Sequence, residues 1–205
     1  MASDPAIPAS ARRGRPRSTH AEQAILKATT EILEERGFPA LTMEEVATRA
    51  GVGKATVYRW WSSKGTLAFD AFLARFLESQ PLPDTGSLRG DLLAALRAWI
   101  RTVKGTATGL ILAGLVAEVQ RDPRLADEWR ERFVGVVRDH HRIMLERAIE
   151  RSEIPPHCDT DVVLDLLYGS AYHRLLQSHL PLTDRFARGV VDIIVDGLTI
   201  GNGGT

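Results

Sequence analysis

Four hydrogen-bonding side chains lie within six consecutive residues, Lys54, Thr56, Tyr58 and Arg59. Ammonium, hydroxyl and guanidinium groups can donate hydrogen bonds to phosphate oxygens and to the edges of bases. Ala55, between them, is small enough to allow a close approach to the bound molecule. These residue types therefore indicate binding of DNA.

Two short helices joined by a tight turn must position these side chains. Thr42-Met43-Glu44-Glu45 is a capping box that begins the first helix. Gly51 and Gly53 form the turn, and the second helix runs from Lys54 to about Trp61. A helix-turn-helix has this layout, in which the second helix enters the major groove. Two short helices of a bundle with a solvated basic face remain the alternative. The apolar residues expected to hold the two helices together are Val46, Ala47, Ala50, Val52 and Val57.

Lys64 stands at the start of the next expected helix, which covers Gly65 to about Ser79. A cation is unfavourable at a helix N-terminus, where the partial positive charge of the helix dipole lies. A phosphate bound by both the lysine and the first amides of the helix would remove this conflict. Lys64 is therefore a candidate phosphate contact.

The segments Gly37-Phe38, Leu41 to Ala47 and Ala50 to Tyr58, followed by Trp61 and Lys64, resemble the DNA-binding domain of the tetracycline-repressor-like (TetR) family. The resemblance covers about residues 20–69. It implies a homodimeric, all-α regulator of about nine helices whose larger domain usually binds a small-molecule effector. It assigns a phosphate contact to Thr42 and to Lys64. It assigns recognition-helix positions to Lys54, Ala55, Thr56, Tyr58 and Arg59.

The sequence departs from the family pattern at three places. Gly53 stands where serine is frequent, which removes a side-chain cap, and Gly65 replaces a frequent glutamate, which weakens the helix that follows. Trp60-Trp61 replaces the usual pair of His or Tyr with Phe. Trp61 is expected to keep a core role, whereas Trp60 is left open between packing and a phosphate contact.

A basic segment precedes the first helix. Arg13, Arg15 and Arg17 surround Gly14 and Pro16, and this Gly-Arg-Pro sequence resembles the core of an AT-hook, which lays arginines in a narrow minor groove. A solvated basic tail with only nonspecific attraction is the alternative. Residues 1–65 carry ten Lys and Arg against seven Asp and Glu, whereas the remainder carries sixteen against nineteen. This asymmetry favours an anionic partner for the N-terminal part.

The rest of the chain shows helical periodicity and no strand pattern, so the predicted fold is all-α. Expected helices cover about 19–36, 88–103, 107–120, 123–150, 159–178 and 183–198. The predicted organisation is a flexible basic arm (1–17), a helix-turn-helix domain (18–64), a connecting helix (65–80), a linker (81–86) and an effector-binding and dimerisation domain (87–205).

Apolar and aromatic stripes follow the helices of the larger domain. Such residues are usually core, but the resemblance implies that some of them line an effector cavity for a largely apolar or aromatic ligand. The candidate lining residues are Trp99, Val103, Leu112, Val116, Phe133, Val137, His140, Met144, Tyr168 and Tyr172.

The last two helices carry more apolar surface than two terminal helices need internally, so they are the expected dimer interface. Two such pairs related by a two-fold axis would form a four-helix bundle. The candidate interface residues are Val163, Leu167, Ser170, Ala171, Val191, Ile194, Val195 and Leu198.

No catalytic constellation, metal site or cofactor is expected. His140 and His141 are adjacent and so diverge on a helix, and Cys158 is the single cysteine. The absence of a signal sequence and of a long apolar stretch predicts a soluble, cytoplasmic protein that does not enter a membrane.

The predicted function is a dimeric regulator, a repressor released from a palindromic operator by a small, largely apolar ligand. A helical small-molecule-binding protein or enzyme with an incidental basic N-terminus, and a ligand-independent regulator or activator, remain alternatives.

Overall fold

The computed structural model describes residues 19–76 and 81–200, all of which form helices, turns and loops without strands. Arg13, Arg15 and Arg17, and the expected end of the connecting helix at Ser79, lie outside these residues. The helices are α1 (Thr19–Arg36), η1 (Phe38–Ala40), α2 (Met43–Arg49), α3 (Lys54–Trp60), α4 (Lys64–Phe76), α5 (Leu88–Val103), α6 (Ala107–Val119), α7 (Pro123–Trp129), η3 (Arg130–Gly135), α8 (Val136–Glu150), α9 (Thr160–Gln177) and α10 (Asp184–Ile200). Because α7, η3 and α8 follow one another without a break, the described part contains nine continuous α-helical rods. The all-α prediction is confirmed.

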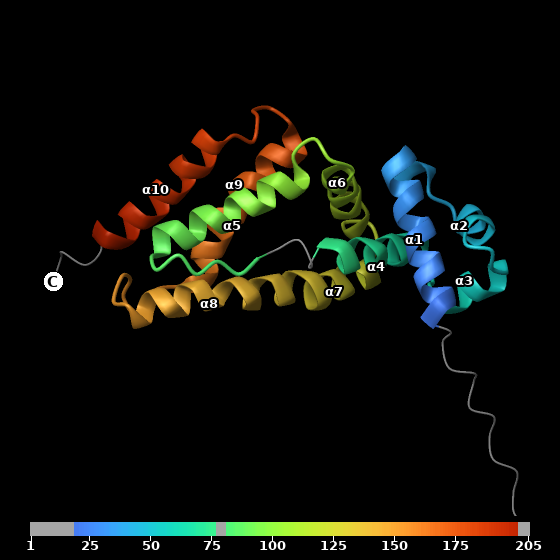
Figure 1. Ribbon diagram of the computed structural model, residues 1–205, viewed down its shortest axis with the longest axis horizontal. Helices are drawn as coiled ribbons and strands as arrows, with labels where there is room; N and C mark the ends of the chain where they lie inside the picture. The colour runs from blue at the N-terminus through green and yellow to red at the C-terminus, as the bar shows by residue number, and fades with distance from the viewer. Residues whose placement is uncertain (1–18, 77–80, 201–205) are drawn as a thin grey trace, which may run out of the picture.

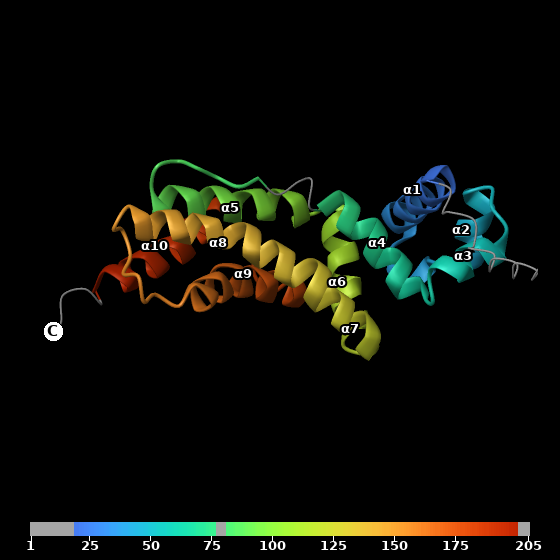
Figure 2. The ribbon, with the colours of Figure 1, turned by 90° about the horizontal axis from the view of Figure 1, so that it is seen from below.

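The molecule is elongated, with α1–α3 at one end and α5, α8, α9 and α10 bundled at the other (Figures 1 and 2). Helices α4 and α6 lie between them, and α4 contacts α1, α6 and α7. Helices α1–α3 are thus attached to the larger bundle through α4 and α6.

Local capping sets most helix boundaries as the sequence predicts. The Thr42 hydroxyl accepts the Glu45 amide of α2 at 3.2 Å, and the Asp122 and Asp159 carboxylates cap α7 and α9. Gly37 ends α1 with φ of 74°, a left-handed conformation that only glycine adopts without strain.

The long helix expected from Pro123 to Glu150 is continuous, but its hydrogen bonding changes in the middle. Its middle, η3, is π-helical, so one extra residue is inserted into the hydrogen-bonding ladder. Side chains after this point are rotated relative to an uninterrupted α-helix. The spacing of apolar residues along the sequence does not indicate such a π-helical turn, because the turn requires no particular residue type.

Two glycines allow the N-terminal helices to pack closely on the larger bundle. A Cβ at Gly65 would lie 3.0 Å from Leu125 Cδ2 of α7 and 3.3 Å from Glu118 Cγ of α6. A Cβ at Gly114 of α6 would lie 3.0 Å from Phe38 Cβ of η1. Gly65 therefore lowers the helix propensity of α4 but allows this helix to lie close to α6 and α7.

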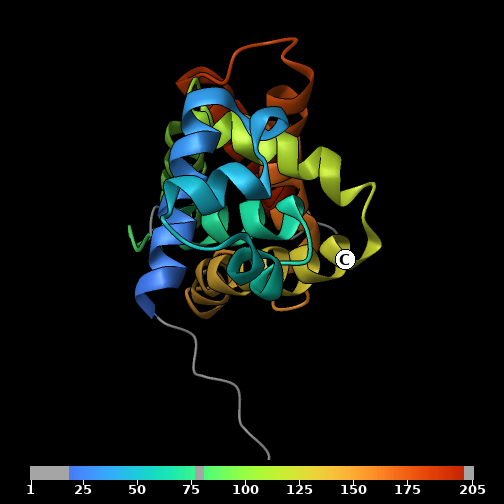
Figure 3. The same cartoon turned by 90° about the vertical axis from the view of Figure 1, so that its right-hand side faces the viewer.

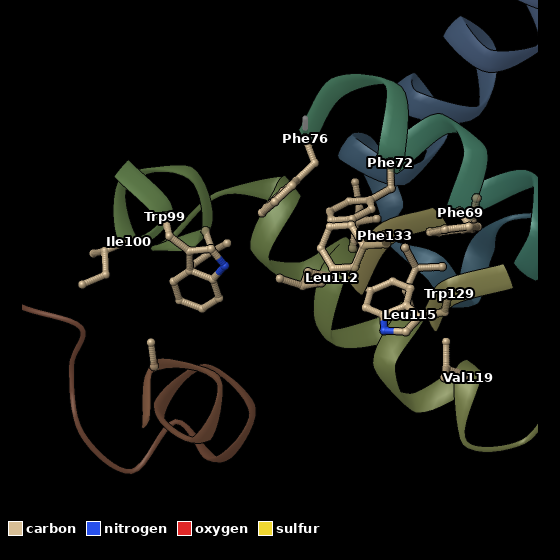
Figure 4. Close-up of a cluster of buried hydrophobic side chains, with 14 of the residues drawn as sticks. Phe69, Phe72, Phe76, Trp99, Ile100, Leu112, Leu115, Val119, Trp129 and Phe133 are labelled. Carbon is tan, nitrogen blue, oxygen red and sulfur yellow. The ribbon is translucent and has the colours of Figure 1, made fainter. Parts of the chain in front are cut away.

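An aromatic cluster joins α4 to α7 and η3. Phe72 lies with its ring centroid 5.0 Å from Phe76, 5.4 Å from Phe133 and 6.2 Å from Trp129. Phe69 adds a further contact to Trp129 at 5.6 Å, and these rings fill the space between the helices (Figure 4). This cluster is a buried connection between α4 and the helix formed by α7 and η3.

Within the described residues, no single helix has the length and apolar character needed to cross a membrane. The pair α5 and α6 passes such a test only jointly, and it is bent by 91°.

Candidate DNA interface and effector cavity

Helix α3 presents one face to solvent at the end of the molecule formed by α1–α3, onto which Figure 3 looks. Lys54, Ala55, Tyr58 and Arg59 are exposed, whereas Val57 is fully buried against the core. Thr56 is half-buried at the edge of this surface. The spacing of polar and apolar residues therefore places the predicted contact residues on one outward-facing surface.

Two ion pairs connect α2 to α1. The Arg49 guanidinium donates to both Glu35 carboxylate oxygens, at 2.8 and 2.9 Å, and Arg36 pairs with Glu45. The hydrogen bond from Arg49 holds the pKa of Glu35 below its ordinary value. Both pairs are solvent-accessible, so their contribution is to orientation more than to stability.

Tyr58 is held by a residue that the sequence prediction did not include. Its hydroxyl donates to Glu44 Oε1 of α2 at 2.8 Å. This hydrogen bond lowers the pKa of Glu44 and raises the pKa of Tyr58. In the free protein Glu44 thus fixes the ring of an exposed tyrosine that has half of its surface accessible. Tyr58 and Glu44 lie fourteen positions apart, on either side of the turn. No local periodicity in the sequence indicates a contact at that separation.

The two tryptophans at the end of α3 differ in burial. Trp61 is buried, and its Nε1 donates to Asp70 Oδ2 of α4 at 2.8 Å. Trp60 is half-buried and packs edge-to-face on Trp61, with the Arg59 guanidinium 5.6 Å from its ring centroid. The Lys64 ammonium lies 4.9 Å from the Phe38 ring centroid, at the first residue of α4.

A cavity of about 400 Å³ lies in the larger bundle, within the range of roughly 300–1,000 Å³ that ligand pockets occupy. Its walls are mainly aromatic and aliphatic side chains contributed by α4 to α9. The lining residues are Phe76, Trp99, Val116, Trp129, Phe133, Val134, Val137, Arg138, His141, Leu164, Asp165, Tyr168, Gly169 and Tyr172.

Six of the ten predicted lining residues border this cavity: Trp99, Val116, Phe133, Val137, Tyr168 and Tyr172. The other four do not. Val103, Leu112 and Met144 are fully buried in the surrounding core, because an apolar stripe wider than the cavity also fills the space between helices. His140 is replaced by its neighbour His141, which lies one further turn along α8 from Val137.

His141 is almost completely buried, and its environment disfavours the protonated ring. Its Nδ1 lies 2.9 Å from the Val137 carbonyl oxygen, and its ring lies 5.2 Å from those of His140 and Tyr168. Burial, followed by the charge of His140, lowers the pKa of His141 to about 4. His141 is therefore neutral at physiological pH.

The folded protein is expected to lose stability in mild acid through His141. Between the ordinary pKa of 6.5 and about 4, the unfolded chain binds a proton at this position that the folded chain does not. The free energy of unfolding therefore falls as the pH decreases through this window, by about 3 kcal/mol at most, and is unaffected above it. Urea unfolding across the window should show a shallower pH dependence for His141→Asn, which keeps a donor to Val137. Equal slopes for the two proteins would contradict this assignment.

A second hollow, of about 380 Å³, lies between α9 and α10 on the outside of the bundle. Its rim carries exposed apolar side chains, with Ile193 77%, Leu166 55% and Val162 51% accessible. The predicted interface residues Val163, Ser170, Ile194 and Leu198 also line it.

The remaining predicted interface residues face the other way. Leu167, Ala171 and Val191 are buried inside the monomer, and Val195 packs against the same core. Both α9 and α10 are apolar on two faces, so the sequence alone did not separate the face that fills the core from the face that remains accessible.

The described residues contain no group of three or more His, Cys, Asp and Glu side chains placed to hold a metal ion. Cys158 is half-buried, and burial raises the pKa of its thiol.

Comparison with known proteins agrees with this arrangement. Residues 25–71 match the family model described as bacterial regulatory proteins, tetR family, and residues 82–194 match that of the tetracyclin repressor-like C-terminal domain. The HTH-type transcriptional regulator YdeS of Bacillus subtilis is 36% identical over 180 residues, covering 88% of this chain and 90% of that protein. The DNA-binding transcriptional repressor TetR of Mycobacteroides abscessus is 30% identical over 186 residues, covering 89% and 94%.

A solved structure shows the same similarity along the whole fold. The crystal structure of the TetR family transcription regulator SCO0332 is 38% identical, with a TM-score of 0.77, and the match covers 87% of this chain and 98% of that chain. With an exposed recognition helix in the N-terminal part and both family models matched in order, the chain belongs to the TetR family of DNA-binding transcription regulators.

Proposed function

We propose that the protein is a homodimeric repressor that binds a palindromic operator in the cytoplasm and is released by a small, largely apolar ligand bound in the α4–α9 cavity. The observation that carries this proposal is the position of α4. Lys64 at its first residue lies next to the DNA-reading segment, and Phe76 at its last described residue forms part of the cavity wall. The name of the Mycobacteroides abscessus relative as a repressor supports the direction of regulation.

The proposed division of labour follows the domains predicted from the sequence. Residues 18–64 read DNA through Thr42, Lys54, Ala55, Thr56, Tyr58, Arg59 and Lys64. The connecting helix predicted at 65–80 and the linker predicted at 81–86 join this domain to residues 87–205, which hold the ligand and the dimer interface. Residues 1–17 act as a basic arm, with Arg13, Arg15 and Arg17 directed to an A·T-rich minor groove.

Asp70 supplies a second connection between the two parts. Its Oδ2 accepts from Trp61 at the end of α3, and its Oδ1 lies 2.7 Å from Arg132 Nη2 of η3. The segment η3 also contributes Phe133 and Val134 to the cavity. A ligand that changes the position of η3 therefore acts on the end of the recognition helix through one carboxylate.

A second copy of the chain is the proposed occupant of the hollow between α9 and α10. Burying its exposed Val162, Leu166 and Ile193 against the same residues of a two-fold partner would complete a four-helix bundle. The two recognition helices must then be separated by roughly 34 Å to enter successive major grooves. Ligand binding releases DNA if it favours a different separation.

Selection of bound DNA from a random pool tests the function directly. We expect an inverted repeat with half-sites about one helical turn apart. Recovery of a sequence without two-fold symmetry, or of no preferred sequence, would contradict the proposal.

Lys64→Ala is expected to weaken binding to all DNA sequences by a similar factor. The reason is that a phosphate contact carries no sequence information. The plot of log affinity against log salt concentration should become shallower by roughly one unit for each Lys64 in contact. Titrations of a selected operator and of unrelated DNA at several salt concentrations measure both effects. Loss of affinity at only one base pair would show that Lys64 contacts a base.

A further inference from the structure

Two buried polar atoms in the cavity wall have no hydrogen-bond partner among the described residues. They are the Tyr168 hydroxyl oxygen on α9 and His141 Nε2 on α8. Their rings are adjacent, with centroids 5.2 Å apart, so the two residues belong to one region of the wall. A buried polar atom without a partner is costly, which makes such a pair a specific place for a polar group of a ligand.

The hydrogen-bonding role of each atom follows from its surroundings. His141 Nδ1 lies 2.9 Å from the Val137 carbonyl oxygen, which can only accept, so Nδ1 carries the proton. The pKa of about 4 keeps the ring neutral, and Nε2 is therefore an acceptor. Burial raises the pKa of Tyr168, so its hydroxyl stays protonated and can donate. The wall thus offers one acceptor beside one donor.

The charged groups of the cavity leave no free cation for an anionic ligand. Arg138 is the only Lys or Arg among the lining residues, and its guanidinium donates to Asp165 at 2.5 Å and to Asp161 at 3.0 Å. The hydrogen bond to Asp165 raises the pKa of Arg138 further. A ligand carboxylate would have to compete with two carboxylates already in place, and burying it unpaired is strongly unfavourable.

We propose that the effector is an uncharged, largely aromatic molecule whose hydroxyl group accepts from Tyr168 and donates to His141. This inference rests on the proposed role of the cavity as the effector site. A hydroxyl meets both requirements with a single atom. The aromatic side chains of Trp99, Trp129, Phe133 and Tyr172 provide the surface for the ring system.

Calorimetric titration of the full-length protein with four naphthalene probes tests the inference. At about pH 7 we expect 1-naphthol, which is neutral there, to bind at least tenfold more tightly than 1-methoxynaphthalene, naphthalene or 1-naphthoate, since an unmet buried hydrogen bond costs about 1–3 kcal/mol. Methoxynaphthalene keeps the acceptor and loses the donor, whereas naphthoate adds charge.

Two variants locate the probe. Tyr168→Phe and His141→Asn should each reduce 1-naphthol affinity by about tenfold, because each removes one of its two partners. Naphthalene affinity should stay nearly constant in Tyr168→Phe, which shows that the cavity is intact. An unchanged preference for 1-naphthol in both variants, or tighter binding of 1-naphthoate or of naphthalene, or no binding of any probe, would overturn the inference.

Failure of the proposed function gives a different result. If 1-naphthol binds with the expected preference and depends on Tyr168 and His141, the ligand class is supported. If no probe then alters the affinity for the selected operator, the role of the cavity in releasing DNA is contradicted while the ligand class stands.

Discussion

Ile193→Arg is expected to produce a folded monomer whose affinity for an operator with two half-sites is reduced by about 100-fold or more. Ile193 is 77% accessible on the rim of the α9–α10 hollow, so its replacement disturbs no core contact. In the proposed dimer, however, two arginines would meet near the two-fold axis with their charges desolvated. Loss of the dimer removes the gain in affinity that comes from linking two half-site contacts.

Sedimentation equilibrium and operator titration measure the two effects separately. Leu110→Arg is the matched control, since Leu110 is a 72% accessible leucine on α6, away from the α9–α10 hollow. This variant should remain dimeric and bind the operator normally. A dimer that persists in Ile193→Arg would show that a different surface mediates assembly.

The parts of this fold that local chemistry controls were predictable from the sequence. Helices α2 and α3 begin at a threonine cap and after a glycine turn, and both signals lie within a few residues of the elements they define. The outward face of α3 follows in turn from the buried position of Val57. No contact between distant segments is needed to predict that this face of α3 is exposed.

The cavity and the dimer face depend on contacts between distant segments, and there the prediction was incomplete. On α8, His141 borders the cavity one helical turn after Val137, whereas His140 does not. Phe76 and Trp129 were absent from the predicted lining because they belong to helices whose relation to the bundle is set by tertiary packing. For α9 and α10, apolar residues on two faces gave no sequence basis for choosing Leu166 over Leu167.

Phe72→Ala is expected to reduce the free energy of unfolding by about 3–5 kcal/mol and to weaken the coupling between ligand and DNA. Phe72 is buried and contacts Phe76, Trp129 and Phe133, which all border the cavity, yet it is not itself a lining residue. In the proposed mechanism Phe72 therefore transmits the position of the cavity wall to α4 without touching the ligand. Phe76→Ala is a poorer test, because Phe76 lines the cavity and its removal would also change ligand binding.

Phe72→Leu separates coupling from stability, because leucine fills much of the space of the ring and its cost is roughly 1 kcal/mol. The naphthalene probe that releases the wild-type operator complex should bind this variant with nearly unchanged affinity. Its effect on operator affinity should be smaller by about fivefold to tenfold, which is a coupling free energy of roughly 1 kcal/mol.

Phe186→Leu is the control, since Phe186 lies on α10, packs against Arg174 and does not border the cavity. If Phe72→Leu is released from DNA as readily as the wild type and the Phe186 variant, the aromatic contacts of Phe72 do not transmit the signal. The Asp70–Arg132 connection would then be the remaining path between the cavity and the recognition helix.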